Sequence, residues 1–147
     1  MTVGVNLLDF KGNLSAPTES VTTAKCVFNS VVSTPGSRCL LADINFFYLS
    51  NILPDPEFMR IPLKIILQEI ISAYDLKTLV DEQVWIYMRI EKGMYGLKQA
   101  GVIANQYLVK HMAPFGYHPV KHTPGLWVHN KKKTLFSLVV DDFCVQY

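Results

Sequence analysis

LFSLVVDDFCVQY, residues 135–147, is the stretch on which the fold prediction depends. Two adjacent acids, Asp141 and Asp142, interrupt an apolar run that is rich in β-branched and aromatic residues. This pattern predicts two short strands joined by a tight turn at the two acids. Carboxylates on a buried hairpin are costly unless a positive charge compensates them, and Mg²⁺ bound through carboxylates and substrate phosphates does so. The alternative is an ordinary solvent-facing acidic turn, because Asp is a common turn residue.

The composition describes a chain that can bury a substantial core. Its 147 residues are typical of one domain, half of them are apolar and 12% are aromatic, which is unlike a disordered segment. The formal net charge is only +2, so the chain has no general attraction to polyanions. A nucleic-acid-binding function would therefore need a local basic surface.

Cysteine usage and the apolar runs indicate an intracellular protein. The three cysteines, Cys26, Cys39 and Cys144, show no CxxC spacing, which argues against a disulfide framework and against the usual kind of zinc site. The first residues lack the features of a signal peptide, and no apolar run approaches the roughly 18 residues of a membrane span. We therefore expect no membrane partner.

A short apolar strand that ends in an acid is predicted within RCLLADINFFYLSN, residues 38–51. Asp43 follows the apolar run directly, where a lone Asp is either a cap for the next turn or a metal ligand at the edge of a sheet. Three consecutive aromatic residues come next, Phe46, Phe47 and Tyr48. One face of a strand cannot bury all three, so we expect at least one of them to line a cleft or to cover neighbouring structure.

The N-terminal part of the sequence predicts strands and a helix that serve for packing and carry no catalytic or binding residues. Residues 1–15 suit one or two short strands. Apolar residues at helical spacing over residues 21–32 predict a packing helix, with Thr18 or Ser20 as its cap and an end at Pro35.

The middle of the chain begins with three prolines and then becomes apolar. Residues 65–73 predict an amphipathic helix, and residues 84–90, which read VWIYMRI, predict a strand with Arg89 as its one charge.

A glycine-rich loop, EKGMYGLKQAG at residues 91–101, precedes a predicted helix from about Gln99 to Met112. Two interpretations of this junction stay open. It is either an ordinary loop-to-helix connection, or a helix N-terminus whose backbone amides, Lys98 and Gln99 face a phosphate or a base.

The four histidines fall close together, between residues 111 and 129, but we do not predict a metal site there, because no cysteine or carboxylate completes a ligand set nearby. Lys131, Lys132 and Lys133 form a basic turn before the final hairpin. A solvated hairpin tip is the simpler interpretation of this turn, and contact with nucleic-acid phosphates is the other.

In combination, these segments resemble the reverse transcriptase domain of copia-type LTR retrotransposons. The matching segments span nearly the whole chain in the family's order: VTTAKCVFNSVVSTPG (21–36), LLADINFFYLSN (40–51), FMRIP (58–62), EKGMYGLKQAG (91–101), PFGYHPVKHTPGLW (114–127) and FSLVVDDF (136–143). A single motif such as VDD is weak, whereas its combination with YGLKQA at this spacing is specific.

The resemblance implies an α+β fold, the polymerase palm, in which helices back an antiparallel sheet, with a partial fingers subdomain. Residues 1–147 are then a partial reverse transcriptase domain. The fingers portions are expected at about 1–37 and 52–95, and the palm portions at about 38–51 and 96–147. The family's thumb and RNase H domains are expected to be absent from this stretch.

The resemblance also implies an activity, RNA-directed DNA polymerisation, in which dNTPs are added to a primer 3′-OH. Asp43, Asp141 and Asp142 are then the catalytic carboxylates and the ligands of two Mg²⁺ or Mn²⁺ ions, since such reactions use two metals about 4 Å apart. Phe47, Tyr48 and Gln99 are expected at the incoming nucleotide, with the Tyr48 ring excluding a ribose 2′-OH.

The implied partners are an RNA or DNA template-primer and dNTPs. Lys98 and the three lysines at 131–133 are the expected nucleic-acid contacts. The implied location is the cytoplasm, in a virus-like particle, or the nucleus. The alternative function is an inactive retroelement remnant that binds nucleic acid weakly at most.

Overall fold

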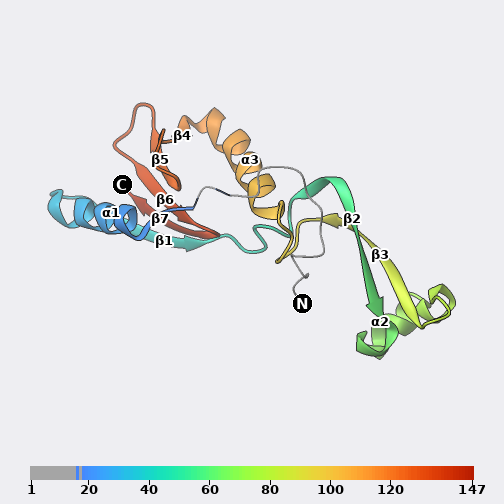
Figure 1. Ribbon diagram of the computed structural model, residues 1–147. Helices are drawn as coiled ribbons and strands as arrows, with labels where there is room; N and C mark the ends of the chain where they lie inside the picture. Colours follow the sequence, from blue (N-terminus) through green and yellow to red (C-terminus); the bar gives the residue numbers. More distant parts are fainter. Residues whose placement is uncertain (1–15, 17) are drawn as a thin grey trace. The chain divides into compact units, whose positions relative to one another are not determined.

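The computed structural model describes Ala16 and residues 18–147, and the chain divides into two compact units. The described residues up to Asn51 form the first unit together with Gly93–Tyr147, and Ile52–Lys92 form the second. The strands expected over residues 1–15 lie outside the described residues. Figure 1 labels the helices and strands of both units.

The first unit contains a five-stranded antiparallel sheet in the order β1-β7-β6-β5-β4, with the helices α1 and α3. This confirms the predicted α+β class. Its strands are β1 (Cys39–Asp43), β4 (Tyr117–Pro119), β5 (Leu126–His129), β6 (Leu135–Val139) and β7 (Asp142–Gln146). Its helices are α1 (Val21–Ser33), α3 (Ala100–Met112) and the short 3-10 helix η4 (Ala113–Phe115).

Both helices of the first unit begin and end close to the predicted positions. Ser20 caps α1, because its hydroxyl accepts a hydrogen bond from the Thr23 backbone N–H at 3.1 Å. The helix ends at Ser33, shortly before the proline at position 35. Gln99 is the N-cap residue of α3, and Gly116, with a φ of +84°, ends the turn that follows this helix.

The core of the first unit lies between α3 and one face of the sheet. Strand residues alternate between two faces, so Phe136 and Leu138 of β6 both enter this core. The Phe136 ring stacks on Trp127 of β5, with centroids 5.3 Å apart and an interplanar angle of 14°. Ala104 and Leu108 supply the helix side of the core. This packing fixes β6 and therefore the hairpin that β6 forms with β7.

The second unit is an antiparallel pair of strands, β2 (Ile52–Pro62) and β3 (Trp85–Lys92). The sequence did not predict β2 because prolines cannot donate to a strand ladder. The strand tolerates them for two reasons: it is paired on one side only, and its register shifts between Ile52 and Glu57, around Pro54 and Pro56. β3 confirms the strand predicted at residues 84–90.

Between these strands lie η2 (Leu63–Ile65), α2 (Gln68–Ala73) and η3 (Leu76–Leu79). The helix predicted over residues 65–73 is therefore wrong in its first part. Ile66 and Leu67 have extended backbone, and no side chain caps α2. Apolar spacing alone did not reveal this interruption, because extended residues can be as apolar as helical ones.

We expect Trp127→Ala to lower the free energy of unfolding of the first unit by about 3–5 kcal/mol, the usual cost of removing a large buried aromatic side chain. Trp127 is only 1% exposed and stacks on Phe136. Urea unfolding followed by circular dichroism measures the change. Val32→Ala is the control, because Val32 is 87% exposed and its truncation should change stability by less than about 0.5 kcal/mol.

Candidate functional site

Two acids that are far apart in the sequence meet across neighbouring strands. Asp43 is the last residue of β1, Asp142 is the first residue of β7, and the antiparallel register places them directly opposite each other. Residues in such a pair lie on the same face of a sheet, with Cβ atoms about 4.5–5.5 Å apart. Both acids are exposed, and both line a cavity of about 360 Å³.

The third acid lies in the turn between β6 and β7. Val139 pairs with Asp142, so the turn consists of Val140 and Asp141. The prediction of a turn made by the two acids is therefore wrong by one residue, because Asp142 belongs to a strand. The backbone carbonyl of Asp141 accepts a hydrogen bond from the Ile44 N–H at 3.1 Å, which ties the turn to the residue that follows Asp43.

The turn contains an unfavourable backbone conformation. Val140 has a φ of +61°, a region that β-branched residues rarely occupy and that hairpin turns of this length usually reserve for glycine, asparagine or aspartate. Such outliers cost about 1–3 kcal/mol and cluster at functional sites. Here the strained residue directly precedes two of the three candidate carboxylates.

The opposed acids carry like charges on the same face of the sheet. Neither Asp43 nor Asp142 forms an ion pair with a lysine or arginine of the described residues. Like charges directly opposite each other on a sheet are destabilising, so this arrangement favours a bound cation.

The donor set at the paired acids fits a divalent ion that keeps water and phosphate among its ligands. In the described part of the chain, no group of three or more His, Cys, Asp or Glu side chains is arranged to hold one. Mg²⁺, however, is usually bound through one or two carboxylates together with water and substrate phosphates. Asp43 and Asp142 meet that requirement, and the cavity beside them leaves room for phosphate oxygens.

Contacts between side chains reinforce the pairing of β1 with β7. The Sγ atoms of Cys39 and Cys144 are 3.2 Å apart, and both cysteines are free thiols. Burial, followed by the contact with Cys39, raises the pKa of Cys144 to about 12. The Cys144 thiol therefore stays protonated at neutral pH and acts as a small apolar group between the strands.

Tyr48 lies beside the acidic turn, in a series of turns that follows β1. Its ring packs edge-on against Tyr95, with centroids 5.3 Å apart, and the Tyr95 hydroxyl approaches an Asp141 carboxylate oxygen at 3.5 Å. Burial, then the negative charge of Asp141, then Tyr95 raise the pKa of Tyr48. The Tyr48 side chain is therefore a neutral phenol at physiological pH.

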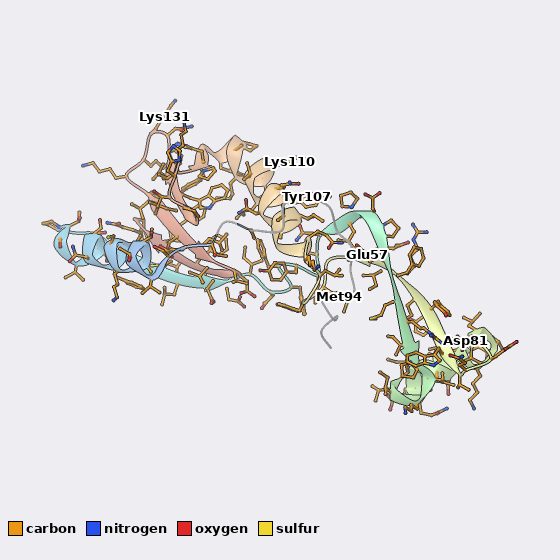
Figure 2. All side chains as sticks on the ribbon, viewed as in Figure 1. Glu57, Asp81, Met94, Tyr107, Lys110 and Lys131 are labelled. Carbon is orange, nitrogen blue, oxygen red and sulfur yellow. The ribbon has the colours of Figure 1, made fainter. Side chains whose placement is uncertain are left out.

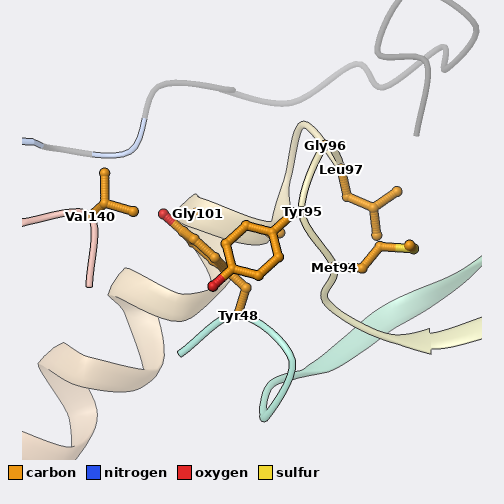
Figure 3. Close-up of a pocket in the computed structure, with 8 residues that line it drawn as sticks. Tyr48, Met94, Tyr95, Gly96, Leu97, Gly101 and Val140 are labelled. Carbon is orange, nitrogen blue, oxygen red and sulfur yellow. The ribbon is translucent and has the colours of Figure 1, made fainter. Parts of the chain in front are cut away.

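A second cavity, of about 290 Å³, surrounds these tyrosines (Figure 3). Its lining comes from the Tyr48 turn, the glycine-rich loop, the start of α3 and the acidic turn: Tyr48, Met94, Tyr95, Gly96, Leu97, Ala100, Gly101 and Val140. The expectation that one of the three consecutive aromatics lines a cleft is confirmed for Tyr48. Sequence reasoning did not single out Tyr95, although its place in the glycine-rich loop was visible.

Two glycines of that loop and helix lie against Tyr48, and one of them, Gly93, is required by the close approach of the Tyr48 backbone. A Cβ atom at Gly93 would lie 2.5 Å from the Tyr48 carbonyl oxygen, a distance at which the backbone must shift. A Cβ atom at Gly101 would lie 3.7 Å from the Tyr48 ring and 3.0 Å from Ala16. The glycine spacing therefore serves to hold the tyrosine in place.

The other predicted nucleotide contacts are not brought to either cavity. Gln99 is 4% exposed at the start of α3, and Phe47 is 9% exposed within the core. Lys98 is half-buried next to Gln99. The contact of these three residues with a nucleotide or with nucleic acid stays a prediction. Phe47 is buried next to Tyr48, so Phe47 has a structural role in supporting Tyr48.

Lys131, Lys132 and Lys133 are exposed in the turn between β5 and β6, where Figure 2 labels Lys131. The backbone N–H groups of the first two lysines donate to His129 Nδ1 at 2.9 Å, a role in turn formation that sequence analysis missed. Five residues of β6, at about 3.3 Å each, separate this turn from the acids. The lysine turn therefore lies about 16 Å along the strand from the acids, at the opposite end of β6 from the proposed phosphate site.

No protein-family model matches the chain, and neither does any curated protein or solved structure. A search of the described residues found no helix that is long and apolar enough to cross a membrane. The assignment of a function therefore depends on the geometry above and on the sequence resemblance.

We expect Asp142→Asn to raise the stability of the metal-free protein at low salt by a few tenths of a kcal/mol, up to about 1 kcal/mol, because it removes a like-charge pair. Chemical unfolding in a chelator measures the difference. Asp55→Asn is the control, since Asp55 is exposed and has no residue opposite it in the strand register. A variant less stable than the wild type would show that the two carboxylates do not repel each other.

Proposed function

We propose that this chain carries the catalytic centre of a copia-type RNA-directed DNA polymerase. In this proposal, residues 38–51 and 96–147 belong to the palm, and residues 52–95 belong to the fingers together with the N-terminal segment. The observation that carries the proposal is the register that places Asp43 opposite Asp142, with Asp141 in the adjoining turn. Three carboxylates from two separate motifs thus come together, as a phosphoryl-transfer site requires.

The proposed reaction is attack by a primer 3′-OH on the α-phosphate of a dNTP, with pyrophosphate as the leaving group. The chemistry that two bound Mg²⁺ or Mn²⁺ ions supply in such sites is neutralisation of charge at the attacking and leaving oxygens. In this proposal, Asp43 and Asp142, which are opposite each other in the register, would hold these ions, and Asp141 in the adjoining turn would assist. The carbonyl of Asp141 and the N–H of Ile44 keep both segments in position.

Tyr48 is proposed to select the sugar of the incoming nucleotide. Its ring lines the cavity next to Asp141, packs edge-on against Tyr95 and lies beside Gly101 of α3. A ring held on two sides cannot easily retreat, so a ribose 2′-OH in this cavity meets a steric barrier that a deoxyribose does not.

The proposed partners are an RNA or DNA template-primer and dNTPs. The turn at Lys131–Lys133 lies too far from the acids to hold the triphosphate, so we assign it to the phosphates of the template-primer farther along the duplex.

Primer extension on poly(rA)/oligo(dT) with dTTP and Mg²⁺ or Mn²⁺ tests the proposed activity. We expect extension by the wild type and a loss of at least about a hundredfold in the Asp141→Asn, Asp142→Asn double variant, because the charges that hold the ions are gone. The double variant should also lose the thermal stabilisation that Mg²⁺ gives the wild type. Asp75→Asn, at an exposed turn of the second unit, is the control.

A folded wild type that neither extends a primer nor is stabilised by Mg²⁺ would overturn the proposal. The chain would then be an inactive retroelement remnant, in which the three carboxylates are inherited from an active polymerase but no longer catalyse a reaction.

The sugar-selection role is tested by Tyr48→Val. We expect discrimination against rNTPs, measured as the ratio of kcat/KM for dTTP and UTP, to fall about tenfold or more, because the smaller side chain leaves room for a 2′-OH. Tyr107→Ala is the matched control, since Tyr107 is a half-exposed tyrosine on α3 that lines neither cavity (Figure 2). An unchanged ratio in the Tyr48 variant would remove Tyr48 from this role.

A further inference from the structure

The two strands of the second unit have one buried face and one open face. Ile61 and Ile86 are opposite each other in the register and are 4% and 2% exposed, so their face forms the core of this unit. Side chains alternate along a strand, which places the residues on either side of this pair on the opposite face. That opposite face has a different composition.

Three cross-strand rows make up the open face, which we call the aromatic-arginine face. The rows are Pro62 with Trp85, Arg60 with Tyr87, and Phe58 with Arg89. Each row contains one aromatic residue, the charged residues in the three rows are arginines, and Glu91, two residues after Arg89 in β3, adds one acid to the same face. Phe58 is 68% exposed and Tyr87 is 62% exposed, so two flat rings are open to solvent.

Arg60 is held rigidly in the middle of this face. Its guanidinium lies 4.4 Å from the centre of the Trp85 ring and 5.6 Å from that of Tyr87, within the range of cation–π attraction. It also donates hydrogen bonds to Gln83 at 2.7 Å and to Asp81 at 3.2 Å.

Asp81, which Figure 2 labels, is itself fixed by the chain that precedes β3. Its second carboxylate oxygen accepts from the backbone N–H groups of Trp85 at 2.8 Å and Gln83 at 3.0 Å. The hydrogen bond from Trp85, then that from Gln83 and the charge of Arg60, hold the pKa of Asp81 below its ordinary value. Arg60 and Trp85 therefore form a preorganised flat surface.

Arg89 is available to a ligand. It is 3.4 Å from Glu91, but both side chains are more than half exposed, and exposed ion pairs contribute little. A phosphate can therefore compete for Arg89 at small cost.

We propose that the aromatic-arginine face binds single-stranded nucleic acid, with bases stacked on Tyr87 and Phe58 and with Arg60 and Arg89 contacting bases or phosphates. Open aromatic rings on a sheet are suitable platforms for unpaired bases, and guanidinium planes stack on bases as well. The bases of a duplex are already stacked on one another and cannot use such a platform. This site belongs to the second unit alone and does not depend on the carboxylates of the first.

The charge of the unit makes the proposal more specific. Residues 52–92 contain seven acidic and five basic side chains, so the second unit as a whole does not attract polyanions. Arg60 and Arg89 are the basic side chains on this face, so affinity should fall with salt as expected for about two phosphate contacts, with stacking supplying the rest.

Fluorescence anisotropy of a labelled single-stranded oligonucleotide of about 12 nucleotides, with the full chain in a chelator, tests this site. We expect Tyr87→Leu and Phe58→Leu each to weaken binding at least fivefold, because leucine keeps apolar area but removes the ring. Tyr74→Leu is the matched control: Tyr74 is a 72% exposed tyrosine of the same unit that follows α2 and is not on this face.

Tryptophan fluorescence locates the bound strand. Trp127 is 1% exposed, so quenching by the oligonucleotide should come from Trp85 and should disappear in Trp85→Phe. The Asp141→Asn, Asp142→Asn variant should bind the oligonucleotide as the wild type does. Loss of polymerase activity with retained binding, or the reverse, therefore separates this proposal from the proposed function.

Four results would overturn the proposal: no binding by the folded wild type, equal binding by all variants, a preference for duplex that Tyr87→Leu and Phe58→Leu weaken as much as single-strand binding, or loss of single-strand binding only when Lys131–Lys133 are replaced. Absence of oligonucleotide binding together with binding of a proline-rich peptide, which also docks on aromatic side chains, would assign the face to a protein partner instead.

Discussion

The antiparallel pairing of β1 with β7 is the constraint on which the candidate site depends. Asp43 and Asp142 come together only in this register, and a slip of one residue would move Asp43 to the other face of the sheet. The register is set by features remote from the acids. Phe136 and Leu138 fix β6 in the core, β6 fixes β7 through a two-residue turn, and the Cys39–Cys144 contact joins β7 to β1. Packing of apolar side chains thus determines the spacing of the charged ones.

The site concentrates features that are unfavourable for folding. Two carboxylates face each other with no basic partner among the described residues, and a valine occupies a left-handed backbone conformation between the strands. These costs fall on a hairpin whose other face is buried against Trp127 and α3, where the gain from apolar burial is large. Local conflict with folding preferences, compensated elsewhere, is typical of functional sites.

The sequence predicted elements whose signals are local. The Ser20 cap and the α3 helix follow from patterns within a few residues, and both appear as expected. The acidic turn was misplaced by one residue because the pairing of Asp142 with Asp43, a partner far away in the sequence, decides where the strand begins. β2 was missed because its prolines argue against a strand, and only the single-sided pairing makes them acceptable. Likewise, the stack of Arg60 on Trp85 joins residues on two strands, which no local pattern reveals.

The left-handed valine in the acidic turn couples stability to the shape of a cavity. Val140 contributes its side chain to the wall of the tyrosine cavity, and its backbone sets the turn that presents Asp141. Glycine would relax the backbone but remove the wall, and a larger residue would fill the cavity while keeping the strain. A substitution of Val140 would therefore change the free energy of unfolding and the shape of the cavity together, while all three carboxylates stay in the sequence.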